Sequence, residues 1–264
     1  MSLELDTRQR AMLQEMGITV WQPETVYLED EPAFVAAIPA VVEKPQIAIN
    51  KIAPQAMNTP AKPIVMQPMP AGMQEMDWST LQHTAQTCQA CQLCTGRKRS
   101  AFGTPAAAQP ADWLIVGDPP TEGDEAAGAA FTGDEGVLLG NMLKAMGLSV
   151  EQVTLTPAVK CRTEGQSTGA QELAQCEAYL RRQVALTRPK MILAMGRYAA
   201  QALLANTVSN PVPPLGQLRG TVHQYQGIPV VVTYSPANLL RSPADKAKAW
   251  ADVCLAKAAL QSPG

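Results

Sequence analysis

In the last two thirds of the chain, short runs of consecutive apolar residues alternate with segments in which apolar residues recur at helical spacing. The runs predict strands at residues 112–117, 152–160, 190–196, 222–226 and 228–234. Helical spacing predicts helices at residues 78–87, 136–146, 171–186, 196–204 and 243–260. An apolar run without alternation is typical of a strand buried on both faces. Strands that alternate with helices predict an α/β fold with a mostly parallel sheet.

A short amphipathic pattern opens the chain. Met12, Leu13 and Met16 lie at helical spacing, and Ile18 and Trp21 follow as an apolar tip. A segment this short cannot bury its apolar face alone and is marginal as an isolated helix. Either it packs back on its own domain, or it is a linear motif that folds on a partner.

A proline-rich segment favours the second alternative. Residues 23–76 contain nine prolines, which interrupt both helix and strand. They predict a long, disordered linker that lets the N-terminal peptide reach a distant partner. The predicted organisation is therefore a partner-binding peptide at 1–22, a linker at 23–76 and an α/β domain at 77–264.

Charge and hydropathy argue against a membrane or secreted protein but leave nucleic-acid binding open. The net charge is −2, with an acidic front and a mildly basic body, so nucleic acid near the body is allowed but not required. No apolar run reaches the length of a membrane span, and the N-terminus has no secretory pattern. A cytoplasmic protein without membrane contact is expected, in which cysteines act as thiols or metal ligands.

Three cysteines, Cys88, Cys91 and Cys94, fall within seven residues. The first two have ligand spacing, which alone does not separate zinc, an iron–sulfur cluster and a redox dithiol. Cys161 ends the second predicted strand and Cys176 lies in the next helix, so both reach one end of the sheet. Four thiolates suit a [4Fe–4S] cluster or, alternatively, a structural zinc. Cys94 remains an alternative for one of the first pair.

The remaining cysteine and the two histidines indicate less. Cys254 is expected in the core, on the apolar face of the last helix. His83 and His223 are expected to be structural rather than catalytic. The alternative that all six cysteines are ordinary buried thiols accounts poorly for three of them in so short a segment.

From Cys88 onward the chain resembles the family 4 uracil-DNA glycosylases, which carry a [4Fe–4S] cluster. The blocks that carry the resemblance are Cys88-x-x-Cys91-x-Leu93, LIVGDPPTEGDE at 114–125, Phe131-Thr132-Gly133, Val159-Lys160-Cys161-Arg162 and Tyr234-Ser235-Pro236. The resemblance implies a three-layer α/β/α domain. It also implies Cys88, Cys91, Cys161 and Cys176 as cluster ligands, with Cys94 outside the set.

The catalytic positions of that family are changed here. Asp118 replaces a glutamate that serves the attacking water, and Pro157 replaces the asparagine that reads the uracil edge. Ser235 replaces a histidine that stabilises the departing uracil, whereas Phe131 matches the base-stacking aromatic. Three changes together predict a vestigial pocket of Asp118, Phe131 and Ser235 without catalytic residues, because fold persists while function moves with the site.

Residues 12–21 resemble the opening peptide of the psi subunits of bacterial DNA polymerase III, which binds the clamp-loader collar. The resemblance implies a non-catalytic replication subunit whose domain contacts the chi subunit and, through it, single-stranded-DNA-binding protein.

The alternative is a divergent uracil-DNA glycosylase of base-excision repair, in which Asp118, Glu122 or Asp124 orients water. Residues 97–99, Arg-Lys-Arg, either make weak DNA contacts or form a solvated face.

Overall fold

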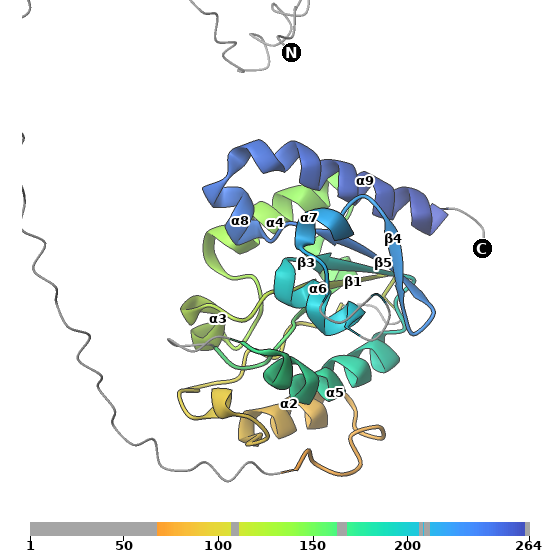
Figure 1. Cartoon of the computed structure of the whole chain (residues 1–264). Coiled ribbons are helices and arrows are strands. Elements are labelled where there is room, and N and C mark those ends of the chain that lie inside the picture. Colours follow the sequence, from red (N-terminus) through yellow and green to blue (C-terminus); the bar gives the residue numbers. More distant parts are fainter. Residues whose placement is uncertain (1–67, 107–110, 163–167, 206–207, 209–211, 262–264) are drawn as a thin grey trace, which may run out of the picture. The chain divides into compact units, whose positions relative to one another are not determined.

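A five-stranded sheet in the order β2-β1-β3-β5-β4 forms the centre of the structure, which is a computed structural model (Figure 1). Its strands are β1 (Trp113–Gly117), β2 (Val153–Pro157), β3 (Met191–Met195), β4 (Val222–Tyr225) and β5 (Ile228–Thr233). The first four in the sheet order are parallel, and β4 runs antiparallel to β5. The structure describes residues 68–106, 111–162, 168–205, 208 and 212–261.

Both faces of the sheet are covered, which explains the continuous apolar runs. In β1, Leu114 and Val116 pack into one core with residues of α2, α5 and α6, while Ile115 points into a second core with residues of α4 and α9. Successive side chains of a strand point to opposite faces, so a strand between two helical layers must be apolar throughout. All five residues of β1, β2 and β3 are accordingly buried.

Helices form the two outer layers (Figure 1). The α-helices are α2 (Trp78–Thr87), α3 (Glu122–Ala127), α4 (Gly133–Met146), α5 (Ala170–Thr187), α6 (Arg197–Leu204), α7 (Leu215–Leu218), α8 (Pro236–Arg241) and α9 (Lys246–Gln261). Within the described residues, short 3₁₀ helices occupy Gln92–Cys94, Val150–Gln152 and Pro243–Asp245. The predicted α/β architecture with its mostly parallel sheet is confirmed.

The short helices were not predicted from the sequence. Helix α3 begins at Thr121, whose hydroxyl accepts a hydrogen bond from the Asp124 amide, and α8 begins at Ser235 with Pro236 in its first turn. Both have good capping residues but too few residues to show helical periodicity. The second strand ends earlier than predicted, at Pro157.

The predicted partner-binding residues Met12, Leu13, Met16, Ile18 and Trp21 lie outside the described residues. So does most of the proline-rich segment. Its last residues are described, and they contact the domain. Met73 is buried, and the Arg182 Nε donates a hydrogen bond to the Met76 carbonyl (2.7 Å). No helix in the described part of the chain is long and apolar enough to cross a membrane.

Candidate active site

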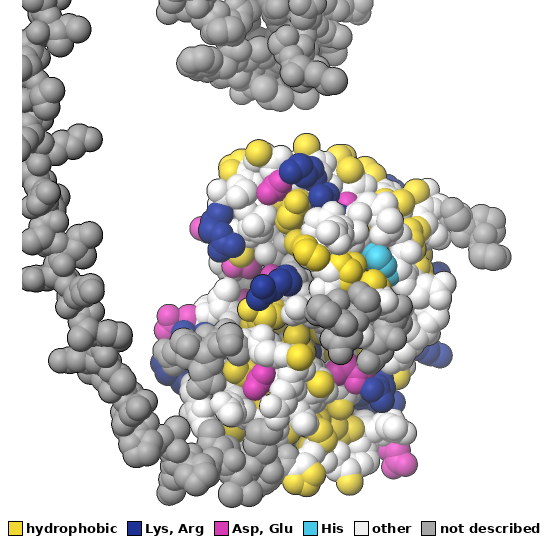
Figure 2. Space-filling view, in the orientation of Figure 1, with side chains coloured by type: hydrophobic (Ala, Val, Ile, Leu, Met, Phe, Trp, Pro, Cys, Tyr) yellow, Lys and Arg dark blue, Asp and Glu magenta, His cyan; other side chains and the backbone are white. Residues whose placement is uncertain are grey.

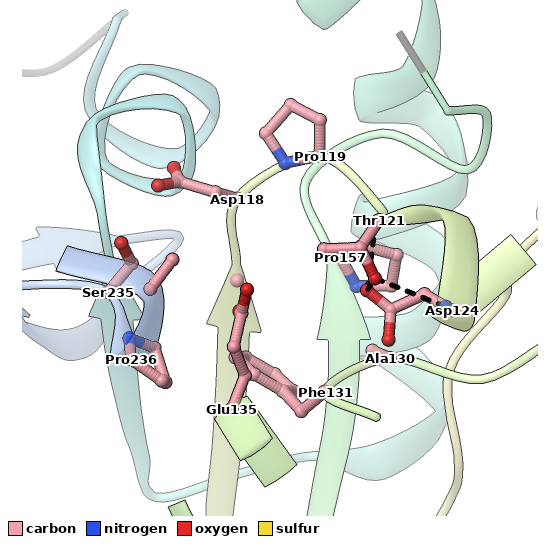
Figure 3. Close-up of a pocket in the computed structure, with 12 residues that line it drawn as sticks. Asp118, Pro119, Thr121, Asp124, Ala130, Phe131, Glu135, Pro157, Ser235 and Pro236 are labelled. Carbon is pink, nitrogen blue, oxygen red and sulfur yellow. Dashed lines mark hydrogen bonds between the residues drawn. The ribbon is translucent and has the colours of Figure 1, made fainter. Parts of the chain in front are cut away.

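A cavity of about 100 Å³ opens where the carboxyl ends of β1, β2 and β5 meet (Figure 3). Parallel strands end at one edge of the sheet, and this edge is where α/β folds bind ligands. The cavity is lined by Gly117, Asp118, Pro119, Thr121, Asp124, Ala130, Phe131, Glu135, Pro157, Ser235, Pro236 and Ala237. The structure therefore brings together Asp118, Phe131, Pro157 and Ser235, which the sequence analysis singled out.

Asp118 directly follows β1 and lies over the turn from β3 into α6. Its Oδ1 accepts a hydrogen bond from the Tyr198 amide (2.9 Å), and Ser235 lies on the same wall of the cavity. The absence of a side chain at Gly196 leaves space for the Asp118 carboxylate, since a Cβ there would lie 2.1 Å from Asp118 Oδ2. Burial raises the pKa of Asp118, whereas the donors from α6 and Ser235 lower it. The side chain is a fixed acceptor at the cavity wall.

Phe131 forms another wall of the cavity, between α3 and α4. Its backbone has φ 58°, a left-handed conformation that is unusual for a bulky residue. Two glycines accommodate it. A Cβ at Gly117 would lie 2.5 Å from the ring, and one at Gly136 would lie 2.1 Å from the Phe131 carbonyl oxygen. Such over-determined strain is typical of functional sites.

Gly117→Ala is expected to displace the Phe131 ring and to weaken binding of a planar ligand in the cavity roughly tenfold, because stacking of a planar ring on an aromatic side chain is worth about 1–3 kcal/mol. The measurement is a binding titration with a free pyrimidine base, which gives the half-saturating concentration. Gly216→Ala is the matched control, since no heavy atom lies within 4 Å of a Cβ there. Equal half-saturation in both variants contradicts a stacking role for Phe131.

The structure separates the three acidic residues named for the alternative function. Glu122 is exposed and does not line the cavity. Asp124 lines it, but its carboxylate accepts hydrogen bonds from the Thr132 amide (2.7 Å) and from the amide and hydroxyl of Thr121 (both 2.9 Å). Asp124 thus joins α3 to the start of α4. Asp118 is the one of the three with geometry suited to chemistry.

Sequence analysis missed Glu135, which lines the cavity from the first turn of α4. In Figure 3 its side chain points toward the middle of the cavity, between Ser235 and Asp124. Burial and the nearby charges of Asp124 and Asp118 raise the pKa of Glu135. The available signal was an acidic residue in the helix turn that directly follows Phe131.

Pro157 ends β2 beside Gly117 and offers the cavity only an apolar ring. Its carbonyl accepts a hydrogen bond from Lys160 Nζ (2.7 Å), which also bonds to the Thr156 hydroxyl (2.7 Å). Burial lowers the pKa of Lys160 to about 8. Lys160 also lines the cavity that contains the cysteines, and its bond to Pro157 links that cavity to a residue of the candidate active site.

Ser235 is buried and serves the local structure as well as the cavity. Its Oγ accepts a hydrogen bond from the Asn238 amide (3.4 Å) and so caps α8. It is also one of the groups that lower the pKa of Asp118. A serine at this position thus caps α8 and influences Asp118, although it cannot carry a charge.

Five of the six cysteines line a second, small cavity of about 10 Å³. They are Cys88, Cys91, Cys94, Cys161 and Cys176. The four predicted ligands are therefore brought together, and Cys94 lies with them. In the described part of the chain, however, no group of three or more His, Cys, Asp or Glu is arranged to hold a metal ion.

The donor set and its surroundings nevertheless fit an iron–sulfur cluster. Arg97 Nη1 donates a hydrogen bond to Cys161 Sγ (3.3 Å), and the Lys160 amide donates one to Cys176 Sγ (3.4 Å). Donors to sulfur are the usual second sphere of such clusters. Burial raises the pKa of Cys91 to about 11 and that of Cys176 to about 12, so these thiols are neutral without a positive centre.

Several secondary predictions have clear outcomes. The prediction that Cys254 is a core residue is wrong, since it is exposed on α9, which turns Val253 and Ala256 inward. Alanines on many sides of that helix left its buried face ambiguous. His83 is exposed, and His223 Nε2 lies 2.8 Å from the Leu218 carbonyl oxygen, so neither lines the candidate active site.

The comparisons with known proteins now decide the family. The model of the uracil DNA glycosylase superfamily matches residues 105–258. This chain belongs to the uracil DNA glycosylase superfamily. It is 30% identical over 185 residues to a type-4 uracil-DNA glycosylase of Pyrobaculum aerophilum, covering 68% of this chain and 93% of the relative.

Other relatives carry the same name. A type-4 uracil-DNA glycosylase of Archaeoglobus fulgidus is 30% identical over 159 residues, 58% of this chain and 79% of that protein. One of Saccharolobus solfataricus is 31% identical over 162 residues, 59% and 74% of the two chains. Nothing in these matches points to a polymerase subunit.

The interpretation as a non-catalytic psi-type subunit is therefore contradicted. Relatives at about 30% identity over most of the chain are named as glycosylases, which are enzymes, and this also overturns the prediction of a pseudo-enzyme. The physical reason is that changed motif side chains did not remove the pocket, which keeps its aromatic wall and carboxylates. The expected contacts with clamp loader, chi subunit and single-stranded-DNA-binding protein stay predictions that no finding tests.

Proposed function

We propose that this chain is a DNA glycosylase that hydrolyses the bond between deoxyribose and a pyrimidine base extruded from DNA, with uracil as the first candidate. The observation that carries the proposal is the meeting of Phe131 and Asp118 in one small cavity at the carboxyl edge of the sheet. Enzymes that act on a base take it out of the stack into such a pocket. The names of the relatives support the same reaction class.

The cavity suits a single ring. Its volume of about 100 Å³ is well below that of sites for drug-sized ligands, and a cavity on the order of 150 Å³ holds benzene. A base in it lies against the Phe131 ring and beside the apolar ring of Pro157. Because Pro157 has no side-chain donor or acceptor, recognition of the base edge falls to the carboxylates and to the backbone.

Asp118 is assigned two tasks during hydrolysis. Its negative charge stabilises the positive charge that develops on the sugar as the base departs, and it accepts a proton from the attacking water. Both tasks need an ionised carboxylate in a fixed position. The hydrogen bond from the Tyr198 amide holds that position, and it favours the charged form.

Two exposed arginines near the cavity are suited to bind the phosphates of the DNA strand on either side of the extruded nucleotide. Arg197 opens α6 near Asp118, and Arg241 ends α8 near Glu135. On the face shown in Figure 2, Lys and Arg side chains (dark blue) lie over the region of α8 and toward α6. Phosphates of an extruded nucleotide are the expected ligands of these guanidinium groups.

The second cavity is proposed to hold a [4Fe–4S] cluster on Cys88, Cys91, Cys161 and Cys176. When bound, such a group would supply thiolate–iron bonds that join the segment after α2 to the segment after β2 and to α5. The role is structural, since Lys160 and Pro157 separate this cavity from the one with Asp118.

The proposal is tested by incubating the full-length protein, purified without oxygen, with end-labelled single- and double-stranded oligonucleotides that contain one deoxyuridine. Alkali cleaves the strand at each abasic site formed. Strand cleavage at the deoxyuridine alone is expected, faster in the single strand because no base pair has to be broken. No cleavage with uracil or another damaged pyrimidine, under conditions where a type-4 enzyme cleaves fully, overturns the proposal.

A further inference from the structure

Glu135 has an unusual place in the candidate active site. It is a charged residue that points into a small cavity, and it makes no hydrogen bond or ion pair with the described residues. The neighbouring acids differ in this respect. Asp118 is held by the Tyr198 amide, and Asp124 by Thr121 and Thr132. A carboxyl group left without a partner at the middle of a pocket is available to a ligand.

We infer that Glu135 is the group that gives a proton to the departing base, an inference that rests on the proposed glycosylase activity. Ser235 lies on the other side of the cavity. Its hydroxyl is a much weaker acid than a carboxylic acid and is therefore a poor proton donor to the base. Pro157 has no proton to give. Among the described residues that line the cavity, Glu135 is the only free acid that faces the space for the base.

The environment of Glu135 favours its protonated form. Burial is the largest cause of its raised pKa, and the charges of Asp124, from α3, and Asp118, after β1, act in the same direction. Arg241, at the end of α8, and the N-terminal end of α4 act against it. A base that fills the cavity removes more water and strengthens the burial effect. Two carboxyl groups of one site thus take opposite roles.

The reaction balances with these two groups. The bond between C1′ and the base nitrogen breaks, and its electron pair goes to the base. Protonated Glu135 transfers its proton to the carbonyl oxygen beside the broken bond. The water oxygen bonds to C1′, and the water proton goes to the Asp118 carboxylate. The products are the free base and a hydroxyl at C1′, after which solvent returns both carboxyl groups to their starting states.

The test compares Glu135→Gln with the wild-type protein in single-turnover excision from single strands that contain deoxyuridine or 5-fluorodeoxyuridine. Glutamine keeps the shape but has no acidic proton. Removal of a general acid costs about 10²–10⁴ in rate, so we expect about a hundredfold loss with uracil. With 5-fluorouracil, a better leaving group that needs less protonation, the loss is expected to be about tenfold or less.

The pH profile gives a second readout. In the wild type the rate falls as pH rises through the pKa of Glu135, which lies above the ordinary glutamate value of about 4.3. In Glu135→Gln this alkaline decline is expected to disappear. Asp134→Asn is the matched control, because Asp134 lies in the same helix turn, is exposed and does not line the cavity.

The outcomes separate the two claims. A wild type that releases no base overturns the proposed function, and this inference with it. An active wild type whose Glu135→Gln variant loses no rate, or loses it equally on both bases with an unchanged pH profile, overturns the role of Glu135 alone. Melting temperature and affinity for DNA with an abasic-site analogue, both expected to stay at the wild-type values, exclude a folding defect.

Discussion

Asp118→Asn is expected to slow single-turnover release of uracil by about a thousandfold, within the range of about 10²–10⁴ that general acid–base groups contribute. Asparagine keeps the size of the side chain and can still accept the hydrogen bond from the Tyr198 amide. What it loses is the negative charge opposite the sugar and the capacity to take a proton from water. The measurement is excess-enzyme kinetics with a deoxyuridine-containing single strand.

The pH dependence of Asp118 has a definite sign. Because the ionised form is required, the wild-type rate falls as pH drops through the Asp118 pKa, which burial holds above the ordinary value of about 3.9. Asp118→Asn is expected to lose this acidic decline. Glu122→Gln is the control, since Glu122 lies in the next helix, exposed and outside the cavity. An Asp118→Asn variant that releases uracil at the wild-type rate would contradict the role of Asp118 as the proton acceptor for the attacking water.

Replacing Cys161 or Cys176 by serine is expected to remove the iron and sulfide and to unfold much of the domain. Single domains are stable by only about 5–15 kcal/mol, and the loss of a metal centre that joins three segments removes a large part of that. Cys161 lies in the segment that follows β2 and Cys176 lies in α5, and both are buried. Iron and acid-labile sulfide are measured on protein purified without oxygen, and stability by thermal unfolding.

Two variants serve as controls for the cluster. Cys254→Ser changes an exposed thiol on α9, and iron content and melting temperature are expected to stay the same. Cys94→Ser tests the ligand set, because Cys94 lines the same cavity as the four proposed ligands. Iron that persists in Cys88→Ser and disappears in Cys94→Ser contradicts the assignment. Zinc in place of iron decides for the alternative metal.

The prediction of a pseudo-enzyme rested on three motif positions alone. Asp118, Pro157 and Ser235 differ from the residues of the family they resemble, and the three changes together suggested a loss of catalysis. The structure shows that the Tyr198 amide fixes Asp118 and that a further carboxyl, Glu135, enters the same cavity. The chemistry of a pocket depends on its whole set of side chains, and that set comes from the ends of β1 and β2, from α3 and from the starts of α4 and α8.

The sequence by itself determined the main helices and strands and many of the residues that form the two cavities. Apolar runs such as 113–117 are strands because only a strand buried on both faces tolerates them, and the cysteine spacing marked the residues that share a cavity. These are local properties, so local patterns contain them.

Only the tertiary structure decided which side chains meet. The order β2-β1-β3-β5-β4 brings the ends of β1, β2 and β5 together, and no local pattern encodes it. In the tertiary structure, Asp124 accepts three hydrogen bonds, whereas Glu135 makes none with the described residues. It also turned Cys254 outward. Burial, charge proximity and hydrogen-bond saturation are properties of neighbours in space, and they separate a catalytic carboxylate from a structural one.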